Sequence, residues 1–161
     1  MTPHRTIVIA TPLGPMTAVA DESALKSLQF GATPEATAAC AGKVLSQIEA
    51  ELAAYFAGEL TDFETPVAPE GTPFQLRVWR ELQQIPCGET RSYAAIANAL
   101  GDPKATRAVG TANGANPIAI IVPCHRVIRT GGALGGYAGG LDAKRWLLDH
   151  ERQHVGQLLF I

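Results

Sequence analysis

The sequence of 161 residues is poor in cysteine, in aromatic residues and in long apolar runs. Its three cysteines, Cys40, Cys87 and Cys124, are an odd number at irregular spacing, which argues against a disulfide framework and fits a reducing compartment. The longest apolar stretch, Pro117 to Pro123, is far shorter than the ~20 residues of a membrane span, and the N-terminus has no signal-peptide core. We therefore expect a soluble cytoplasmic protein with no membrane partner.

Charge is small overall but unevenly distributed. The formal net charge is −2, and 47% of the residues are hydrophobic, which is enough for a substantial core. Residues 1–70 contain nine acidic and three basic residues, whereas residues 71–130 contain three acidic and seven basic ones. A chance fluctuation is one interpretation. The other is that the middle of the chain faces an anionic partner.

The first 70 residues predict a small antiparallel β-sheet followed by one helix. Three β-type segments are separated by turn sequences, at about residues 6–11, 16–20 and 25–30. Residues 34–57 show helical periodicity, and Gly58 follows in the position of a C-terminal cap. The proline-bearing segment "TDFETPVAPEGT", residues 61–72, coincides with the change in charge. We expect a linker there, which divides the chain into domains 1–70 and 71–161.

From Thr72 onward the pattern is that of short capped helices. "TPFQ" has a threonine N-cap, a proline at the first helical position and a glutamine at the third, a capping box. Ser92 is predicted to cap a second helix that stops at Gly101, and Asp102 to cap a third that ends near Gly114. Two short helices on a tight turn indicate a helix-turn-helix or an ordinary helical corner. The expected fold class is α+β, with a mainly helical C-terminal domain.

The third predicted helix has an unusually small surface. Its only long cationic side chains are Lys104 and Arg107, and five of its residues are alanine or glycine: Ala105, Ala108, Gly110, Ala112 and Gly114. A glycine inside a helix costs about 1 kcal/mol relative to alanine. Close approach to a neighbouring helix, or to a narrow groove of DNA, would offset this cost.

The sequence "HERQH", residues 150–154, matches the H-E-x-x-H pattern of zinc hydrolases. On a helix it places His150 and His154 on one face as zinc ligands, with Glu151 as the general base. A catalytic zinc needs a third protein ligand, and only seven residues follow His154. The alternative is a polar helix end whose histidines offset the helix dipole. We expect no metal.

The sequence "IAIIVPCHRV" runs an apolar segment into Pro123 and then places Cys124 beside His125. Cys124 is either a small buried hydrophobe at the end of a core strand or a nucleophile. Adjacent residues of a strand point to opposite faces, so contact between Cys124 and His125 needs a bend at Pro123 or a bridging water. A thiol with a pKa of about 8.5 also needs a base and an orienting carboxylate.

Four segments in order resemble the O6-alkylguanine-DNA alkyltransferase family: "IPCGETRSYAAIA", "RAVGTANGANP", "PCHRVI" and "GYAGGLDAKRWLLDHE". The resemblance is close over about residues 72–151 and covers residues 1–70 only in layout, that of a ribonuclease H-like support domain. It implies direct-reversal DNA repair by a monomer without cofactor. The alkyl group of O6-alkylguanine, or O4-alkylthymine, in double-stranded DNA would pass irreversibly to the protein's own cysteine, in the reaction of a single-turnover methylated-DNA–protein-cysteine methyltransferase.

The resemblance also implies roles for single residues. Cys124 would accept the alkyl group, His125 would deprotonate it through a water molecule, and Glu151 would hold the imidazole and favour its cationic form. Asn116 would tie the cysteine loop to the DNA-recognition helix. Tyr93 would donate a hydrogen bond to the departing guanine.

The same resemblance implies contact with the DNA minor groove and a pocket for a flipped base. The implied DNA contacts are Tyr93, Ala94, Asp102, Lys104, Thr106, Arg107 and Thr130. Arg107 would fill the gap left by the base, whereas the carboxylate of Asp102 would repel phosphate unless it caps the helix. The implied pocket residues are Leu134, Tyr137, Ala138, Gly139 and Lys144. Residues 131–140 would form the flexible wall of this pocket, although an ordinary glycine-rich surface loop has the same composition.

Two other functions are compatible with parts of the pattern. Alkyltransferase-like proteins bind such lesions without chemistry, but they replace the cysteine that this chain retains as Cys124. A zinc hydrolase would use "HERQH". Cys87 is either a second reactive thiol or an inert turn residue.

Overall fold

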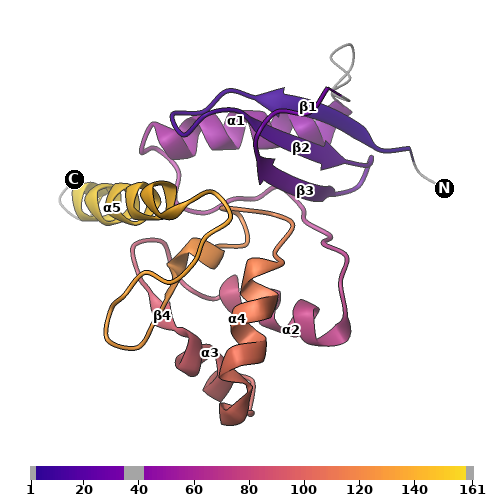
Figure 1. The fold of residues 1–161 in the computed structure, drawn as a ribbon. Coiled ribbons are helices and arrows are strands. Elements are labelled where there is room, and N and C mark those ends of the chain that lie inside the picture. The colour runs from indigo at the N-terminus through magenta and orange to yellow at the C-terminus, as the bar shows by residue number, and fades with distance from the viewer. Residues whose placement is uncertain (1–2, 35–41, 159–161) are drawn as a thin grey trace. The chain divides into compact units, whose positions relative to one another are not determined.

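The computed structural model describes residues 3–34 and 42–158 and divides into two compact units, with the division after Glu70. Figure 1 shows a three-stranded sheet with one helix in the first unit and a mainly helical second unit. Cys40 and the first part of the helix predicted over residues 34–57 lie outside the described residues. Within the described ranges, no helix combines the length and apolar character that a membrane crossing requires.

The sheet of the first unit consists of β1 (Arg5–Ile9), β2 (Met16–Ala20) and β3 (Leu25–Phe30), in the order β1-β2-β3 and antiparallel throughout. This arrangement confirms the predicted sheet. β1 ends earlier than expected because Thr11 starts a turn: its hydroxyl donates to the Gly14 carbonyl and accepts from the Leu13 N–H.

The helix of this unit, α1 (Gly42–Phe56), packs against β1 and β2 through one apolar face. The buried residues of that face are Val44, Leu45, Ile48, Leu52 and Tyr55. Gly58 has a φ of +79° and donates to the Tyr55 carbonyl, while the Glu59 N–H donates to the Ala54 carbonyl. This Schellman motif confirms the predicted glycine cap.

The proline-bearing segment after α1 is not a free linker along its whole length. The carboxylate of Glu51 on α1 accepts hydrogen bonds from the backbone and hydroxyl of Thr65. The Leu25 N–H donates to the Pro66 carbonyl, and the Ala68 N–H donates to the Leu25 carbonyl. Residues 64–68 therefore belong to the first unit, and only the last few residues before Thr72 are left to join the two units.

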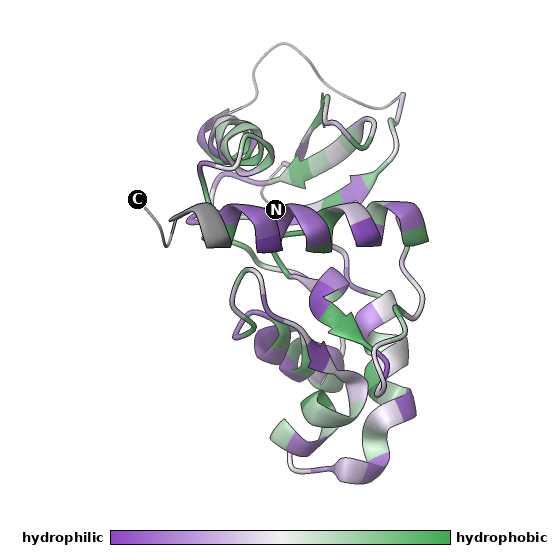
Figure 2. Cartoon of the chain, turned by 90° about the vertical axis from the view of Figure 1, so that its left-hand side faces the viewer, coloured by the Kyte–Doolittle hydropathy of each residue, from purple (hydrophilic) through white to green (hydrophobic). Residues whose placement is uncertain are grey.

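Four α-helices form most of the second unit, as Figure 1 shows: α2 (Pro73–Leu82), α3 (Tyr93–Ala99), α4 (Thr106–Gly114) and α5 (Leu141–Leu158). The predicted capping box of α2 is present, because the Thr72 hydroxyl accepts from the Gln75 N–H at 3.1 Å and the Gln75 side chain accepts from the Thr72 N–H at 2.9 Å. Most of α5 is hydrophilic, with hydrophobic residues recurring along it (Figure 2). Leu147 and Leu148 on its apolar side are buried.

Helices α3 and α4 pack against each other and form the helix-turn-helix. Ser92 caps α3 as predicted, since its hydroxyl accepts from the Ala95 N–H at 3.0 Å. The prediction that Asp102 caps the next helix is wrong. Pro103–Ala105 forms a 3₁₀ turn before α4, whose closing bond goes to the backbone carbonyl of Asp102, and the exposed carboxylate makes no capping hydrogen bond.

The exposed side of α4 carries short side chains apart from Arg107. Its inner side is held by Trp79 of α2, whose indole N–H donates to the Ala112 carbonyl at 2.9 Å. A Cβ added at Gly110 would lie 3.9 Å from the Tyr93 ring, which is an ordinary contact. Packing inside this unit therefore does not require a glycine at position 110, and the alternative reason, close approach to a partner, remains.

Candidate active site

Cys124 begins a single 3₁₀ turn, Cys124–Arg126, directly after Pro123. The bend expected at Pro123 is thus present, and the apolar residues before it form a buried loop rather than a core strand. After the turn, β5 (Val127–Ile128) pairs in parallel with β4 (Arg91–Ser92), the two residues that precede α3. This short ladder fixes the cysteine turn beside the start of the helix-turn-helix. Cys124 remains 7% exposed.

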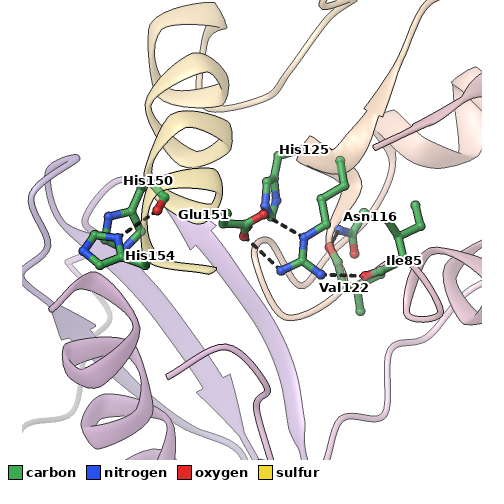
Figure 3. Close-up of polar contacts among 8 residues, drawn as sticks. Ile85, Asn116, Val122, His125, His150, Glu151 and His154 are labelled. Carbon is green, nitrogen blue, oxygen red and sulfur yellow. Dashed lines mark hydrogen bonds and ion pairs between the residues drawn. The ribbon is translucent and has the colours of Figure 1, made fainter. Parts of the chain in front are cut away.

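The loop before the cysteine is held by Asn116 (Figure 3). Its amide nitrogen donates to the carbonyls of Val122 at 2.8 Å and Ile118 at 3.2 Å, and its oxygen accepts from the Ile118 N–H at 3.0 Å. Within this loop Ile120 has a φ of +71°, a left-handed conformation that costs a β-branched residue about 1–3 kcal/mol. The three hydrogen bonds of Asn116 help to hold the strained backbone in place.

Burial raises the pKa of the Cys124 thiol, and other groups only partly oppose it. The opposing groups are the Asn116 side chain, the charge of Lys144 and the backbone N–H groups of Cys124 and His125. The net direction is upward, so the resting side chain is a thiol at neutral pH. A nucleophilic Cys124 therefore needs a base that removes its proton at the moment of reaction.

Beside the cysteine, Glu151 of α5 joins His125 and Arg126 in a buried network. Its Oε2 lies 2.8 Å from Nε2 of His125 and 2.9 Å from Nη2 of Arg126, and its Oε1 accepts from Nε of Arg126 at 2.8 Å. Arg126 also donates to the Ile85 carbonyl at 2.7 Å. Figure 3 shows Glu151 pointing from its helix toward His125. The bidentate pair fixes the carboxylate, which in turn fixes the imidazole.

The charges in this network follow from burial and pairing. Burial raises the pKa of Glu151, but His125 and Arg126 more than offset it and hold that pKa well below its usual range. Burial lowers the pKa of His125, and the attraction of Glu151 does not fully compensate. The resemblance implies that Glu151 favours the cationic imidazole. The charge of Glu151 does raise the pKa of His125, but burial lowers that pKa by more, so the imidazole of the resting site is neutral.

The neutral imidazole has a defined tautomer. Because a carboxylate only accepts hydrogen bonds, Nε2 of His125 carries the hydrogen that faces Glu151. The other nitrogen, Nδ1, is buried and has no hydrogen-bond partner among the described residues. Nδ1 is therefore the atom of this site that can accept a proton.

Two residues of the site escaped the sequence analysis. Arg126 is buried and forms an ion pair with the carboxylate of Glu151. The feature of the sequence that could have indicated this role is an arginine inside an otherwise apolar run. Asn113 of α4 is also buried, and its amide nitrogen lies 3.4 Å from the Cys124 carbonyl oxygen. Asparagine on a helix lined by small residues gave no distinct signal.

Tyr93 and the glycine-rich loop lie against each other. Gly135 has a φ of +71°, and a Cβ there would lie 2.9 Å from the Tyr93 hydroxyl. Burial and then the nearby Cys124 raise the pKa of Tyr93. The ring of Tyr137 stands edge-on to His125 with centroids 6.4 Å apart, and burial raises the pKa of Tyr137 strongly. Both hydroxyls therefore stay protonated and can donate hydrogen bonds.

The other predicted site residues fall into two groups by exposure. Five are exposed on the helix-turn-helix or on the loop after β5: Asp102, Lys104, Arg107, Thr130 and Ala138. Four are half-buried: Ala94, Thr106, Leu134 and Gly139. Lys144 is fully buried, and its ammonium donates to backbone carbonyls.

In "HERQH" the rings of His150 and His154 lie together, with centroids 4.2 Å apart, but Glu151 points away from them toward His125. Figure 3 shows His150 and His154 on the opposite side of α5 from the His125 that Glu151 contacts. His150 stacks on Trp146 with ring centroids 4.6 Å apart, and Nδ1 of His154 lies 2.8 Å from the His150 carbonyl oxygen. Over the ranges that the structure describes, no three His, Cys, Asp or Glu residues form a group that could hold a metal ion.

Known proteins match both units of the chain. The family model for the 6-O-methylguanine DNA methyltransferase DNA binding domain matches residues 73–153, and the one for the ribonuclease-like domain of the same proteins matches residues 5–69. The methylated-DNA–protein-cysteine methyltransferase of Methanosarcina acetivorans is 48% identical over 149 residues, covering 89% of this chain and 96% of its own. The protein of the same name from Mycobacterium tuberculosis is 48% identical over 157 residues, covering 91% of this chain and 92% of its own.

A solved structure also matches this chain. The crystal structure of Mycobacterium tuberculosis OGT in complex with DNA superposes with a TM-score of 0.85 and 48% identity, covering 94% of this chain and 93% of that one. The two family models span both units and include the cysteine turn, the helix-turn-helix and most of α5. This chain therefore belongs to the 6-O-methylguanine DNA methyltransferase family.

Proposed function

We propose that this protein repairs O6-alkylguanine, and by extension O4-alkylthymine, in double-stranded DNA by moving the alkyl group to Cys124. The observation that carries the proposal is a single thiol at the head of a turn that also contains His125, whose imidazole is held by a buried carboxylate. The match of residues 73–153 to the DNA binding domain of the family supports the proposal, since the turn lies within these residues. The reaction needs no cofactor, and each protein molecule acts once.

The first step is removal of the thiol proton. Neutral His125 takes it at Nδ1 through a bridging water molecule, while Nε2 stays hydrogen-bonded to Glu151. Glu151, which Arg126 holds in place, stabilises the imidazolium that forms, as a buried carboxylate does for a catalytic histidine. Asn116 and the backbone N–H groups of the turn stabilise the sulfur anion.

The second step is a single displacement at the alkyl carbon. The sulfur–carbon bond forms as the carbon–O6 bond breaks, and the electron pair leaves with guanine. Tyr93, at the first position of α3, donates a hydrogen bond to the departing base, and the proton removed from Cys124 returns to that base. The products are a thioether at position 124 and an unmodified guanine.

The DNA contact is assigned to the helix-turn-helix. The bare exposed side of α4 suits the minor groove, which is too narrow for bulky side chains. Arg107 is the long side chain on that side and fills the stack when the base flips into the pocket of Leu134, Tyr137, Ala138 and Gly139. Lys104, Thr106, Ala94 and Thr130 are assigned to further contacts with the DNA. Asp102, which does not cap α4, weakens phosphate binding locally.

The remaining parts of the proposal concern context. Residues 1–70 act as a support domain, and residues 71–161 carry both DNA binding and the alkyl acceptor. Since the chemistry requires a reduced thiol, we propose that the protein works in the cytoplasm, where thiols are kept reduced. A monomer suffices, because the site residues named above all come from one chain.

The proposed function is tested by incubating the protein with a duplex that contains one O6-methylguanine. The lesion is expected to become guanine while the intact protein gains the mass of one methyl group in place of a proton. Release of free modified base, or restored guanine without a mass gain on the protein, would show a different chemistry.

Arg107→Ala is expected to slow methyl transfer from duplex DNA by about 10- to 100-fold, since it removes the side chain that replaces the extruded base. Transfer from free O6-methylguanine base needs no extrusion and is expected to change less than about 3-fold. Single-turnover rates with the two substrates measure this ratio, and Arg145→Ala, an exposed cation of α5, serves as the matched control. Equal losses with both substrates would contradict the role.

A further inference from the structure

Lys144 of α5 is a buried cation that the mechanism above does not use. Its side chain is fully buried, although lysine is among the residues least often found inside proteins. Arg126 and His125, the other buried cationic or basic groups beside the cysteine, both face Glu151. Within the described part of the chain, the hydrogen bonds of Lys144 go to neutral carbonyls and none goes to a carboxylate.

The three carbonyls come from two separate segments. Nζ of Lys144 donates to the Val127 carbonyl of β5 at 2.7 Å, to the Leu134 carbonyl, and to the Gly136 carbonyl at 3.4 Å. An ammonium has three N–H donors, which matches three acceptors. The side chain therefore joins the strand that follows the cysteine turn to the glycine-rich loop.

The two loop carbonyls lie on either side of Gly135, the residue that rests against the Tyr93 hydroxyl. A side chain at Gly135 would collide with that hydroxyl, so the loop and Tyr93 are already as close as a glycine allows. Holding Leu134 and Gly136 thus fixes the distance between the loop and Tyr93.

We propose that Lys144 is a positioning residue whose ammonium fastens the loop Leu134–Gly136 to β5 and so sets the wall of the alkylguanine pocket against Tyr93. This inference rests on the proposed function and replaces direct contact between Lys144 and the base. Lys144 acts through the loop backbone.

The three hydrogen bonds of Lys144 depend on the positive charge of its ammonium group. The charged or titratable groups that face Lys144 are Cys124 and His125 of the cysteine turn and Arg129 after β5. Burial lowers the pKa of Lys144 to about 8. Above that pH the amine has two donors and a lone pair, so one of the three carbonyls loses its hydrogen bond. The pocket should therefore loosen as the pH rises through about 8.

The test compares Lys144→Met with Arg145→Met, which removes an exposed cation from the neighbouring position of α5. Two rates are measured at each pH: methyl transfer from an O6-methylguanine duplex, and capture of Cys124 by iodoacetamide. Both need the thiolate, but only the first needs the pocket, so their ratio cancels the thiolate fraction. Lys144→Met is expected to lower the ratio roughly 10- to 100-fold, as loss of hydrogen bonds to a charged group does. Arg145→Met should leave it within about 2-fold.

The pH profile gives the readout that a merely structural residue would not move. In the wild type the ratio is expected to fall above about pH 8, whereas in Lys144→Met it should stay flat. Lys144→Gln keeps two donors and should lie between them, which tests the idea if the methionine variant does not fold. An unchanged ratio in folded Lys144→Met, or a flat wild-type profile, would overturn the inference. A wild type that transfers no methyl group at all would instead overturn the proposed function.

Discussion

Glu151→Gln is expected to lower the free energy of unfolding by about 3–5 kcal/mol, which is the usual cost of removing one partner from a buried ion pair. Arg126 would lose the charge of Glu151, and the amide has only one acceptor oxygen, so it cannot accept from both Arg126 and His125 at the two positions that the carboxylate uses. The same change should slow methyl transfer by on the order of 10²- to 10⁴-fold, because general-base catalysis has about that value. Urea unfolding and single-turnover kinetics measure the two effects.

The stability effect of Glu151 should depend on pH in one direction. Its pKa in the folded protein lies well below its usual range, whereas in the unfolded chain it is about 4.3. The stabilisation is therefore fully present above about pH 5 and is lost as the pH falls below about 4. The difference between wild type and Glu151→Gln should shrink in that acid range. Asp149→Asn, an exposed carboxylate of the same helix, should change stability by less than about 0.5 kcal/mol. A loss as large in Asp149→Asn would contradict the account.

Cys124→Ser is expected to reduce methyl transfer by on the order of 10⁴-fold or more. A serine hydroxyl is a far weaker acid than a thiol, so neutral His125 cannot produce the anion that the displacement needs. Affinity for O6-methylguanine duplex should stay within about 3-fold, since the exposed residues of α4 are untouched. Fluorescence anisotropy at several salt concentrations measures this affinity, because phosphate contacts make it salt-dependent. Substantial transfer by Cys124→Ser would mean that another atom accepts the methyl group.

The elements with strong local signals were predictable from sequence. The capping box at Thr72, the Ser92 cap and the glycine stop at Gly58 each depend on residues within four positions, and each is present. The prediction that Asp102 caps an α-helix was wrong, because an N-cap residue followed by proline suits a 3₁₀ turn as well as an α-helix. The parallel pair of β4 and β5 has only two residues in each strand, too few to show any periodicity.

Site residues that belong to a motif were predictable from the sequence. The role of a side chain that binds backbone atoms was not. Cys124, His125 and Glu151 follow from the resemblance, and the structure places the imidazole and carboxylate 2.8 Å apart. The resemblance assigns Lys144 to the base pocket, whereas in the structure its ammonium donates to backbone carbonyls. Every residue has a backbone carbonyl, so the sequence does not indicate which ones a lysine will bind. The neutral state of His125 also depends on burial, which only the folded chain determines.

The central claim is that the sulfur of residue 124 is the permanent acceptor of the alkyl carbon. The most direct measurement is peptide mass mapping of the protein after one turnover with an O6-methylguanine duplex, for the wild type and for Cys87→Ser, the other cysteine in the described part of the chain. The account predicts one methyl group, in thioether linkage, on the peptide containing Cys124 in both proteins. A methyl group found on Cys40, on Cys87 or on no peptide at all would contradict it.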